Sequence, residues 1–310
     1  MNTVMHSRIR GVLAPVVTPF GPHGAPDADR LARHCQWLVS NGAGLAVFGT
    51  NSEANSLSLD ERLDLLDRLV AAGVPPARMM PGTGCCAVTD TVKLTAKAVK
   101  LGCAGVLMLP PFYYKNVSDE GLYRTFASVI DAVGDARLRI YLYHIPPVAQ
   151  VGISLTLIDR LLKAYPGTVA GIKDSSGDWT NTSAMLERFS AASFDVFVGS
   201  ESFLLANLRA GGAGCISATA NVNPAPIDRL YREWQSAGAG AQQTALDAVR
   251  AIFQRFPMVA ALKSAIATYS GDADWARVRP PLVELDAAQS AALQTELAAA
   301  AFAMPGLGKR

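Results

Sequence analysis

Val169-Ala170-Gly171-Ile172-Lys173 is an almost continuously apolar run that ends in a lysine. A run this short and apolar is typical of a strand that is buried on both faces of a parallel sheet. A lysine at the end of such a strand is costly unless it is paired or has a use. One interpretation is an ion pair with Asp174 or Asp178 at the rim of the sheet, and the other is an amine nucleophile.

Similar apolar runs recur along the chain, and amphipathic segments separate them. The predicted strands are residues 12–17, 45–48, 78–81, 105–109, 138–143, 169–173, 195–198 and 214–217. The segments between them carry apolar residues near the 3.6-residue period of a helix, at 27–40, 59–72, 89–101, 119–132, 155–163, 181–189, 203–210 and 227–235. Eight strand-then-helix units are the count of a closed barrel, so we predict an α/β fold, a TIM (β/α)8 barrel.

The alternative fold is an open, doubly wound sheet, which usually carries a glycine-rich phosphate loop after its first strand. Here the first predicted strand continues into Thr18-Pro19-Phe20-Gly21-Pro22, which is not such a loop. We expect the catalytic barrel to occupy residues 1–238. Residues 239–310, rich in alanine and leucine, are predicted to form a C-terminal helical appendix packed on the barrel, with a frayed tail from Pro305 onward.

The composition limits the classes of partner. Half of the 310 residues are hydrophobic, and the formal net charge is +2 without the basic stripe that nucleic-acid binding requires. No run approaches the roughly 20 apolar residues of a membrane span, and residues 1–10 lack the apolar core of a signal peptide. The five cysteines show no CxxC spacing, and no histidine motif for a metal occurs. We therefore expect a cytoplasmic protein without a catalytic metal, a nucleic-acid partner or a membrane partner.

Tyr143 ends the predicted strand that precedes the strand of Lys173. In a TIM barrel the chemistry lies at the carboxyl ends of the strands, and consecutive strands are neighbours. Tyr143 and Lys173 are therefore expected to meet at the barrel mouth. A desolvated amine there has a larger neutral, nucleophilic fraction, and a phenol beside it can shuttle protons. Simple packing at the rim is the alternative interpretation of the tyrosine.

The loop Gly49-Thr50-Asn51-Ser52-Glu53 follows the second predicted strand. Backbone N–H groups in a loop of small polar residues can hold a carboxylate, although such composition is more often that of an ordinary loop.

Together and in this order, these segments resemble the dihydrodipicolinate synthase / N-acetylneuraminate lyase family of class I aldolases. The likeness covers nearly the whole chain. It includes the loop 49–53, Tyr143-His144-Ile145-Pro146 where the family has Tyr-Asn-Val/Ile-Pro, the lysine strand 171–173 and the segment 211–221. The resemblance implies that Lys173 forms a covalent imine with a small 2-oxo acid such as pyruvate and that no other cofactor takes part.

The resemblance also implies roles for single residues. Tyr143 would be the general acid/base, Thr50 would relay protons, and Thr50 with Asn51 would hold the pyruvyl carboxylate. Tyr114 would reach into a neighbouring subunit's site in a homodimer or homotetramer, although counting forward from Pro111 selects Tyr113 instead. Further substrate-binding positions implied by the resemblance are Ser175, Gly199, Glu201 and Ile216.

Two departures from the family bear on the substrate. Dihydrodipicolinate synthases carry an arginine shortly after Tyr-Asn-Val-Pro, which binds the carboxylate of aspartate semialdehyde, and Val148 stands at that place here. Asn51-Ser52 replaces Thr-Gly in the carboxylate loop. Ser175 and Glu201 fall where sialic-acid lyases bind sugar hydroxyls, but Ser202 replaces a second acid of those lyases.

We therefore expect a Schiff-base lyase or aldolase that acts on a hydroxylated 2-oxo acid, either a 2-oxo-3-deoxy sugar acid or a 4-hydroxy-2-oxo acid. One alternative is a 4-hydroxy-tetrahydrodipicolinate synthase, against which the missing arginine counts. A second is a dehydratase of 2-oxo-3-deoxy sugar acids, and a third is a regulator that binds a 2-oxo acid without turning it over.

Overall fold

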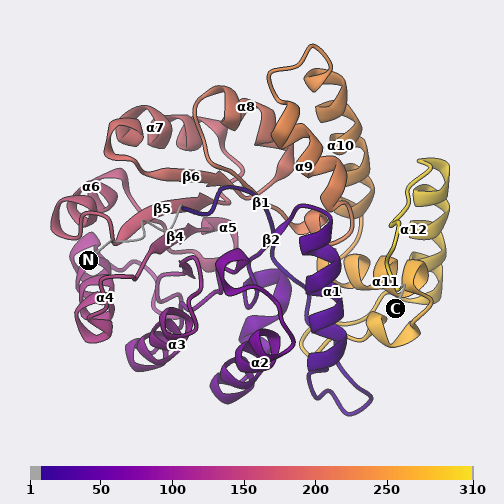
Figure 1. Ribbon diagram of the computed structural model, residues 1–310, viewed down its shortest axis with the longest axis horizontal. Helices are drawn as coiled ribbons and strands as arrows, with labels where there is room; N and C mark the ends of the chain where they lie inside the picture. Colours follow the sequence, from indigo (N-terminus) through magenta and orange to yellow (C-terminus); the bar gives the residue numbers. More distant parts are fainter. Residues whose placement is uncertain (1–7, 309–310) are drawn as a thin grey trace.

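Short parallel strands form a ring in the computed structural model, which describes residues 8–308 (Figure 1). Their order around the ring is β2-β1-β7-β6-β5-β4-β3. The strands are β1 (Gly11–Ala14), β2 (Gly44–Leu45), β3 (Val106–Met108), β4 (Ile140–His144), β5 (Val169–Asp174), β6 (Asp195–Val198) and β7 (Gly214–Ile216).

Residues 79–82 close the ring between β2 and β3. Met79 pairs with Leu45 of β2, and Gly82 pairs with Leu107 of β3, both in parallel. Backbone hydrogen bonds of 2.8 Å join Met80 N to Leu45 O and Leu107 N to Pro81 O. This segment is therefore the eighth strand of the described chain, and the predicted TIM barrel is confirmed.

Helices surround the ring on its outside (Figure 1), as the apolar periodicity of the sequence predicts. They are α1 (Ala28–Ser40), α2 (Leu59–Ala71), α3 (Val88–Lys100), α4 (Asp119–Val133), α6 (Leu155–Ala164), α7 (Trp179–Phe189), α8 (Leu204–Arg209) and α9 (Pro224–Glu233). Serine N-caps start three of them: the hydroxyls of Ser58, Ser118 and Ser154 accept from Glu61 N, Gly121 N and Leu157 N. A single helical turn that the sequence did not indicate, α5 (Pro146–Ala149), follows β4.

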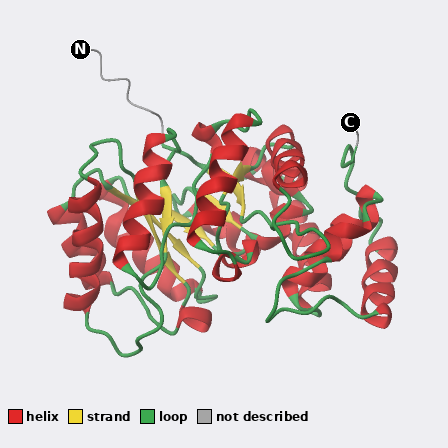
Figure 2. Ribbon diagram, turned by 90° about the horizontal axis from the view of Figure 1, so that it is seen from below, coloured by secondary structure: helices red, strands yellow, loops and turns green. Residues whose placement is uncertain are grey.

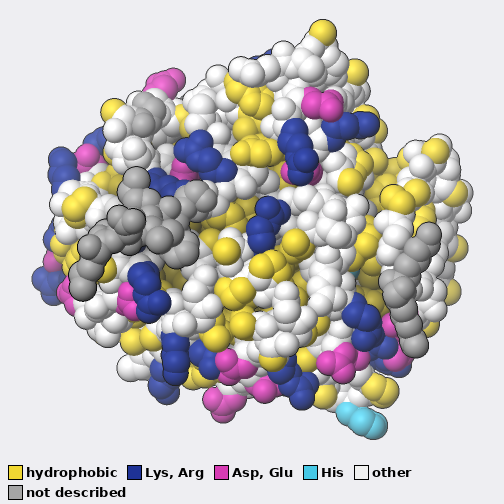
Figure 3. Space-filling model, in the orientation of Figure 1, with side chains coloured by type: hydrophobic (Ala, Val, Ile, Leu, Met, Phe, Trp, Pro, Cys, Tyr) yellow, Lys and Arg dark blue, Asp and Glu magenta, His cyan; other side chains and the backbone are white. Residues whose placement is uncertain are grey.

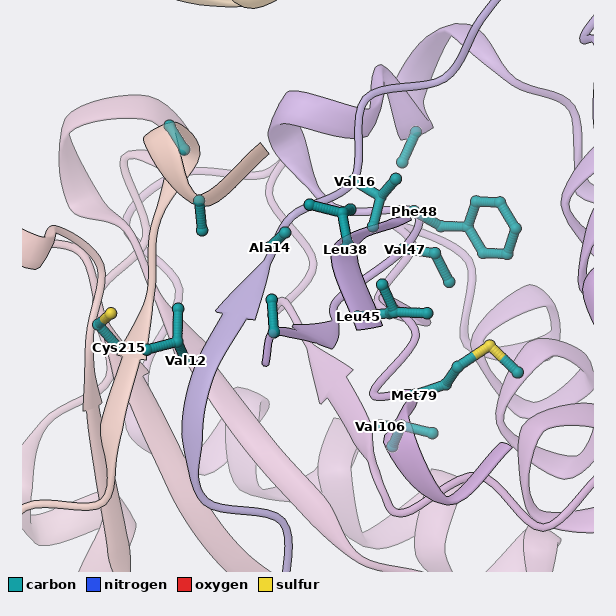
Figure 4. Packing of buried hydrophobic residues seen from close by; sticks show 14 of the residues in the cluster. Val12, Ala14, Val16, Leu38, Leu45, Val47, Phe48, Met79, Val106 and Cys215 are labelled. Atoms are coloured by element: carbon teal, nitrogen blue, oxygen red, sulfur yellow. The ribbon is translucent and has the colours of Figure 1, made fainter. Parts of the chain in front are cut away.

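The apolar residues form two layers. The larger cluster, part of which Figure 4 shows around Val12, Leu45 and Val106, packs the strands against the helices. The smaller cluster fills the barrel itself, where the ring of Tyr141 lies edge-on against Phe197. Gly171 makes room for this ring, because a Cβ atom at that position would lie 2.8 Å from Tyr141 and 2.3 Å from the carbonyl of Asp195.

The C-terminal region contributes α10 (Ala239–Gln254), α11 (Met258–Ser270) and α12 (Ala287–Ala299). These helices lie beside the barrel (Figures 1 and 2), and α10 packs against α8 and α9. The predicted fraying of the tail is wrong for residues 305–308. Met304 is buried, and the indole of Trp37 donates to the Pro305 carbonyl at 3.0 Å, which ties the tail to α1. The last two residues of the expected tail, like residues 1–7 of the predicted barrel domain, lie outside the described chain.

Candidate active site

Lys173 and Tyr143 lie side by side at the carboxyl ends of β5 and β4. The parallel register pairs these two residues directly. Nζ of Lys173 donates to the hydroxyl of Tyr143 at 3.2 Å, and each residue is only 4% exposed. Ile172, between Gly171 and Lys173, packs into the outer cluster, so strand alternation turns the lysine toward the barrel interior.

Thr50 extends this pair into a chain of three polar side chains. Its Oγ1 lies 3.3 Å from the hydroxyl of Tyr143, which therefore stands between the threonine and the amine. Thr50 begins the 3-10 turn η1 (Thr50–Ser52) after β2. The turn is held locally, because Ser52 Oγ accepts from Gly49 N at 3.2 Å and Thr18 Oγ1 donates to Ser52 O at 2.7 Å.

The three side chains line a cavity of about 590 Å³ at the barrel mouth. This volume suits a small organic ligand. Most of the predicted site residues line it together: Thr50, Asn51, Tyr143, Lys173, Ser175, Gly199 and Ile216. The wall also includes Ser202 and the hydroxyl or amide side chains of three residues that the sequence did not single out, Thr182, Ser200 and Gln254.

Asp174 follows Lys173 but does not pair with it. Its carboxylate accepts instead from Thr182 Oγ1 at 2.7 Å, Asn181 Nδ2 at 3.0 Å and Ser176 N at 2.9 Å. Within residues 8–308, Lys173 forms no ion pair, so the structure does not support a rim ion pair as the reason for this lysine. The amine is left next to a phenol in a buried site.

His144 occupies the place of the family's asparagine after Tyr143. Its Nδ1 accepts a hydrogen bond from Ile153 N at 2.9 Å. Burial lowers the pKa of the imidazole, and the nearby Asp174 opposes this shift. The neutral ring is the form that can accept this bond, and it ties the segment after β4 back to the strand end.

Glu201 is placed differently from the expectation for a substrate-binding acid. It is 1% exposed, and it is not among the residues that line the cavity. The hydroxyls of Ser217 and Thr219 donate to its carboxylate, and Nη1 of Arg250 lies 2.8 Å from Oε2. Arg250 itself lines the cavity.

Tyr113 and Tyr114 lie on the surface, 74% and 73% exposed, and pack edge-on against each other. Neither lines the cavity of this single chain. Val148, on α5, lines the cavity and is 62% exposed.

Residues 8–300 match the dihydrodipicolinate synthetase family. The chain belongs to this family. A DapA-like lyase of Chloroflexus aurantiacus, itself uncharacterized, is 33% identical over 92% of this chain and 95% of its own length. A 4-hydroxy-tetrahydrodipicolinate synthase of Agrobacterium fabrum is 32% identical over 93% of this chain and 97% of its own.

Solved structures of the family agree with the fold. Dihydrodipicolinate synthase from Agrobacterium tumefaciens superposes with a TM-score of 0.85 at 32% identity, covering 94% of this chain and 99% of its own. YagE, an Escherichia coli K12 prophage protein of the dihydrodipicolinic acid synthase family solved in complex with pyruvate, gives 0.86 at 27% identity, covering 96% and 100%. The chain is thus an enzyme of the lyase and aldolase class, with the (β/α)8 barrel of its family.

One feature of the cavity could not be predicted from motifs. Arg250, Gln254 and Met258 reach the cavity from α10 and α11, which the sequence presented only as an alanine-rich appendix.

The face in Figure 3 shows basic side chains scattered among acidic and apolar ones. Within residues 8–308, no helix has the length and apolarity to cross a bilayer, and no three metal-ligating side chains gather at one point.

Proposed function

We propose that this enzyme forms a Schiff base between Lys173 and a 2-oxo acid such as pyruvate, and that it acts as a lyase or aldolase on a hydroxylated 2-oxo acid. The observation that carries the proposal is the chain of contacts Thr50–Tyr143–Lys173 in one cavity. The pyruvate complex of YagE supports a 2-oxo acid as ligand. No cofactor beyond the imine is needed for this chemistry.

The imine forms in two steps. The neutral amine of Lys173 attacks C2 of the 2-oxo acid, and one proton passes from the nitrogen to the carbonyl oxygen to give a carbinolamine. The carbinolamine hydroxyl then takes up a proton and leaves as water, while the nitrogen lone pair forms the C=N bond of the protonated imine. Tyr143 serves both steps, because its hydroxyl lies within hydrogen-bond reach of Nζ and of Thr50 Oγ1. Thr50 relays the proton to and from Tyr143.

The protonated imine then withdraws electrons from the substrate. Removal of the proton from the C4 hydroxyl breaks the C3–C4 bond and releases an aldehyde, while the electron pair moves into an enamine on C3. Protonation of C3 and hydrolysis of the imine return pyruvate and free Lys173. Asn51 and Thr50 lie on the same wall and are the groups proposed to hold the carboxylate of C1.

The wall beyond Lys173 favours a hydroxylated chain. Ser175, Ser200 and Ser202 line it, and each offers one donor and two acceptor sites for substrate hydroxyls. Gly199 and Ile216 complete the wall around the reacting carbons.

A 4-hydroxy-tetrahydrodipicolinate synthase is the second candidate, because relatives such as the Agrobacterium fabrum protein carry that name. Val148 is evidence against a synthase activity. It lines the cavity where the family's synthases place an arginine, and an aliphatic side chain cannot bind the carboxylate of aspartate semialdehyde.

The surface tyrosines support a homodimer or homotetramer, and a cytoplasmic location stays a prediction from the sequence. Tyr113, Tyr114 and Val117 expose much apolar area on one loop, which is unusual unless a partner covers it. In a two-fold assembly this loop would bring Tyr114 to the neighbouring subunit's site.

A panel of 2-oxo acids tests the proposed reaction. Each acid is incubated with the enzyme and with Lys173→Ala, and both pyruvate release and loss of water are followed. We expect pyruvate and an aldehyde from at least one 4-hydroxylated acid. Loss of water without pyruvate would make the enzyme a dehydratase, and turnover by Lys173→Ala would remove the Schiff base from the mechanism.

A further inference from the structure

Arg250 reaches the cavity wall from α10 with part of its guanidinium unpaired. Its side chain is 12% exposed, and Nη1 donates to Glu201 at 2.8 Å and to Ser217 at 3.1 Å. Nε is buried without a hydrogen-bond partner, and no hydrogen bond joins Nη2 to any atom of residues 8–308. A buried donor without an acceptor is costly, so an arginine in this state needs an explanation.

Glu201 holds the guanidinium in place. Its carboxylate also accepts from the hydroxyls of Ser217 and Thr219, so its oxygens are occupied and fixed. The acid therefore lies behind the cavity wall, and the arginine that it orients is the charged group available to a ligand. The sequence suggested that the carboxylate of Glu201 would accept from substrate hydroxyls. In the structure, the guanidinium of Arg250 is instead the group that can donate to a ligand.

The unpaired atoms form one edge of the guanidinium. Nε is closed off from solvent, so the N–H groups of Nη2 are the donors that a ligand in the cavity can reach. Glu201 and Ser217 occupy Nη1, which leaves Nη2 without an acceptor. A positively charged donor favours an ionised carboxylate over a neutral hydroxyl, which would gain less from the charge.

The arginine stands at some distance from the reacting carbon. Lys173 ends β5, whereas Ser217, which contacts Arg250, follows β7. With β6 between them, the two strand ends are two strand spacings apart, on the order of 10 Å. Since both Lys173 and Arg250 line the same cavity, a ligand joined to the lysine through C2 meets the arginine at its far end.

We propose that Arg250 binds a carboxylate at the far end of the substrate, so that the enzyme takes hydroxylated 2-oxo dicarboxylic acids. The inference rests on the proposed Schiff base at Lys173. The arginine enters from α10 and not from the segment after β4, where Val148 stands. Glu201 offsets part of its charge, so a tenfold to hundredfold preference for a distal carboxylate is expected, at the lower end of charged hydrogen bonds.

The test compares 2-oxo acids that differ in length and in the group at the far end. Wild-type enzyme and Arg250→Met are titrated with 2-oxoglutarate, 2-oxoadipate, 5-hydroxy-2-oxopentanoate and pyruvate, and the imine at Lys173 is trapped with borohydride and counted by mass spectrometry. The readout does not depend on whether the enzyme cleaves or dehydrates its substrate. Arg255→Met is the matched control, because Arg255 follows the same helix but is 67% exposed and pairs with Glu296.

We expect the half-saturating concentration of at least one dicarboxylic acid to rise at least about tenfold in Arg250→Met. Pyruvate and the hydroxymethyl acid should shift much less, and Arg255→Met should match the wild type for all four. If Arg250→Met does not fold, Arg250→Lys, which keeps a cation for Glu201 but lacks the unpaired Nη2, should give a smaller shift of the same kind.

Equal shifts for all four acids, or no shift for either dicarboxylic acid, would overturn the role of Arg250. Pyruvate separates this failure from that of the proposed function. If the wild type traps no pyruvate, the Schiff base itself is refuted, and the inference falls with it.

Discussion

Lys263 and Glu53 form an ion pair in which neither side chain has any exposure to solvent, with Nζ 2.7 Å from Oε1. Glu53 directly follows the η1 turn that carries Thr50 and Asn51, whereas Lys263 belongs to α11. The other carboxylate oxygen of Glu53 accepts from Arg279 N at 2.8 Å. The C-terminal region therefore anchors the loop that the proposed mechanism uses for proton relay and carboxylate binding.

Lys263→Met should destabilise the enzyme strongly. Burial lowers the pKa of Lys263, and the ion pair with Glu53 opposes this shift. Removing one partner leaves a buried charge, which typically costs about 3–5 kcal/mol. Urea unfolding at pH 7 measures the change. The control is Lys163→Met, because Lys163 is 76% exposed in its pair with Asp159 and its loss should cost less than about 1 kcal/mol. Equal unfolding midpoints for Lys263→Met and the wild type would refute the anchoring role.

Tyr143→Phe should keep the fold but lower kcat by roughly 10²–10⁴, the usual contribution of a positioned acid or base. The ring still fills its buried position, while the hydroxyl between Lys173 and Thr50 is lost. Steady-state kinetics on the preferred substrate provide the measurement. Tyr165→Phe removes a phenol that contacts Asp131 on the surface and should leave kcat unchanged. A Tyr143→Phe enzyme as fast as the wild type would assign the proton transfer to another group.

The barrel was predictable because its signals are local. Each strand buried on both faces is a short apolar run, and the serine caps and the 3.6-residue period mark the helices. The pairing of Tyr143 with Lys173 followed from the rule that consecutive barrel strands are neighbours. The lengths of the strands could be predicted less well from the sequence. Residues 79–82 close the barrel through isolated bridges, so their strand character depends on β2 and β3 on either side.

The outer part of the site could not be predicted in the same way. The sequence position of Glu201 suggests that it binds the substrate. In the structure, its carboxylate instead accepts from the hydroxyls of the segment after β7 and pairs with the guanidinium of Arg250, so it does not line the cavity. Arg250 lies on a helix far along the chain, and no motif marks it. Contacts of this kind depend on how α10 packs against the barrel, which is a property of the tertiary structure alone.

His34 should make the protein sensitive to acid. It is buried against the rings of Trp37 and Trp275, and within residues 8–308 neither ring nitrogen has a hydrogen-bond partner. Burial lowers the pKa of this imidazole from 6.5 to about 4, and the nearby side chain of Asn221 opposes part of the shift. The unfolded chain therefore binds a proton at a higher pH than the folded one, and stability is lost as the pH falls from 6.5 toward 4.

The contribution of His34 amounts to about 3 kcal/mol over that range. Urea unfolding at a series of pH values should show a shallower acid slope for His34→Leu than for the wild type, whatever the absolute stability of the variant. Mutation of the exposed His23 in the same way should leave the slope unchanged. Identical slopes for His34→Leu and the wild type would exclude His34 as the source of the effect.

The enzyme should sediment as a dimer or tetramer at micromolar concentration. The exposed pair of Tyr113 and Tyr114 is the surface expected at the contact. Replacing both by serine should shift the equilibrium toward the monomer, whereas replacing the exposed Val283 by serine should not. A wild-type protein that sediments only as a monomer would leave Tyr114 without a route to a second site.

Trapping of the imine at Lys173 tests the central claim most directly. The enzyme is incubated with pyruvate, reduced with borohydride, digested and analysed by mass spectrometry. We predict one reduced pyruvyl adduct on Lys173, and none in Lys173→Ala or in Lys173→Arg, because a guanidinium stays protonated and cannot attack a carbonyl. A wild-type digest without an adduct, or with the adduct on Lys163 or Lys263, would contradict the Schiff-base account.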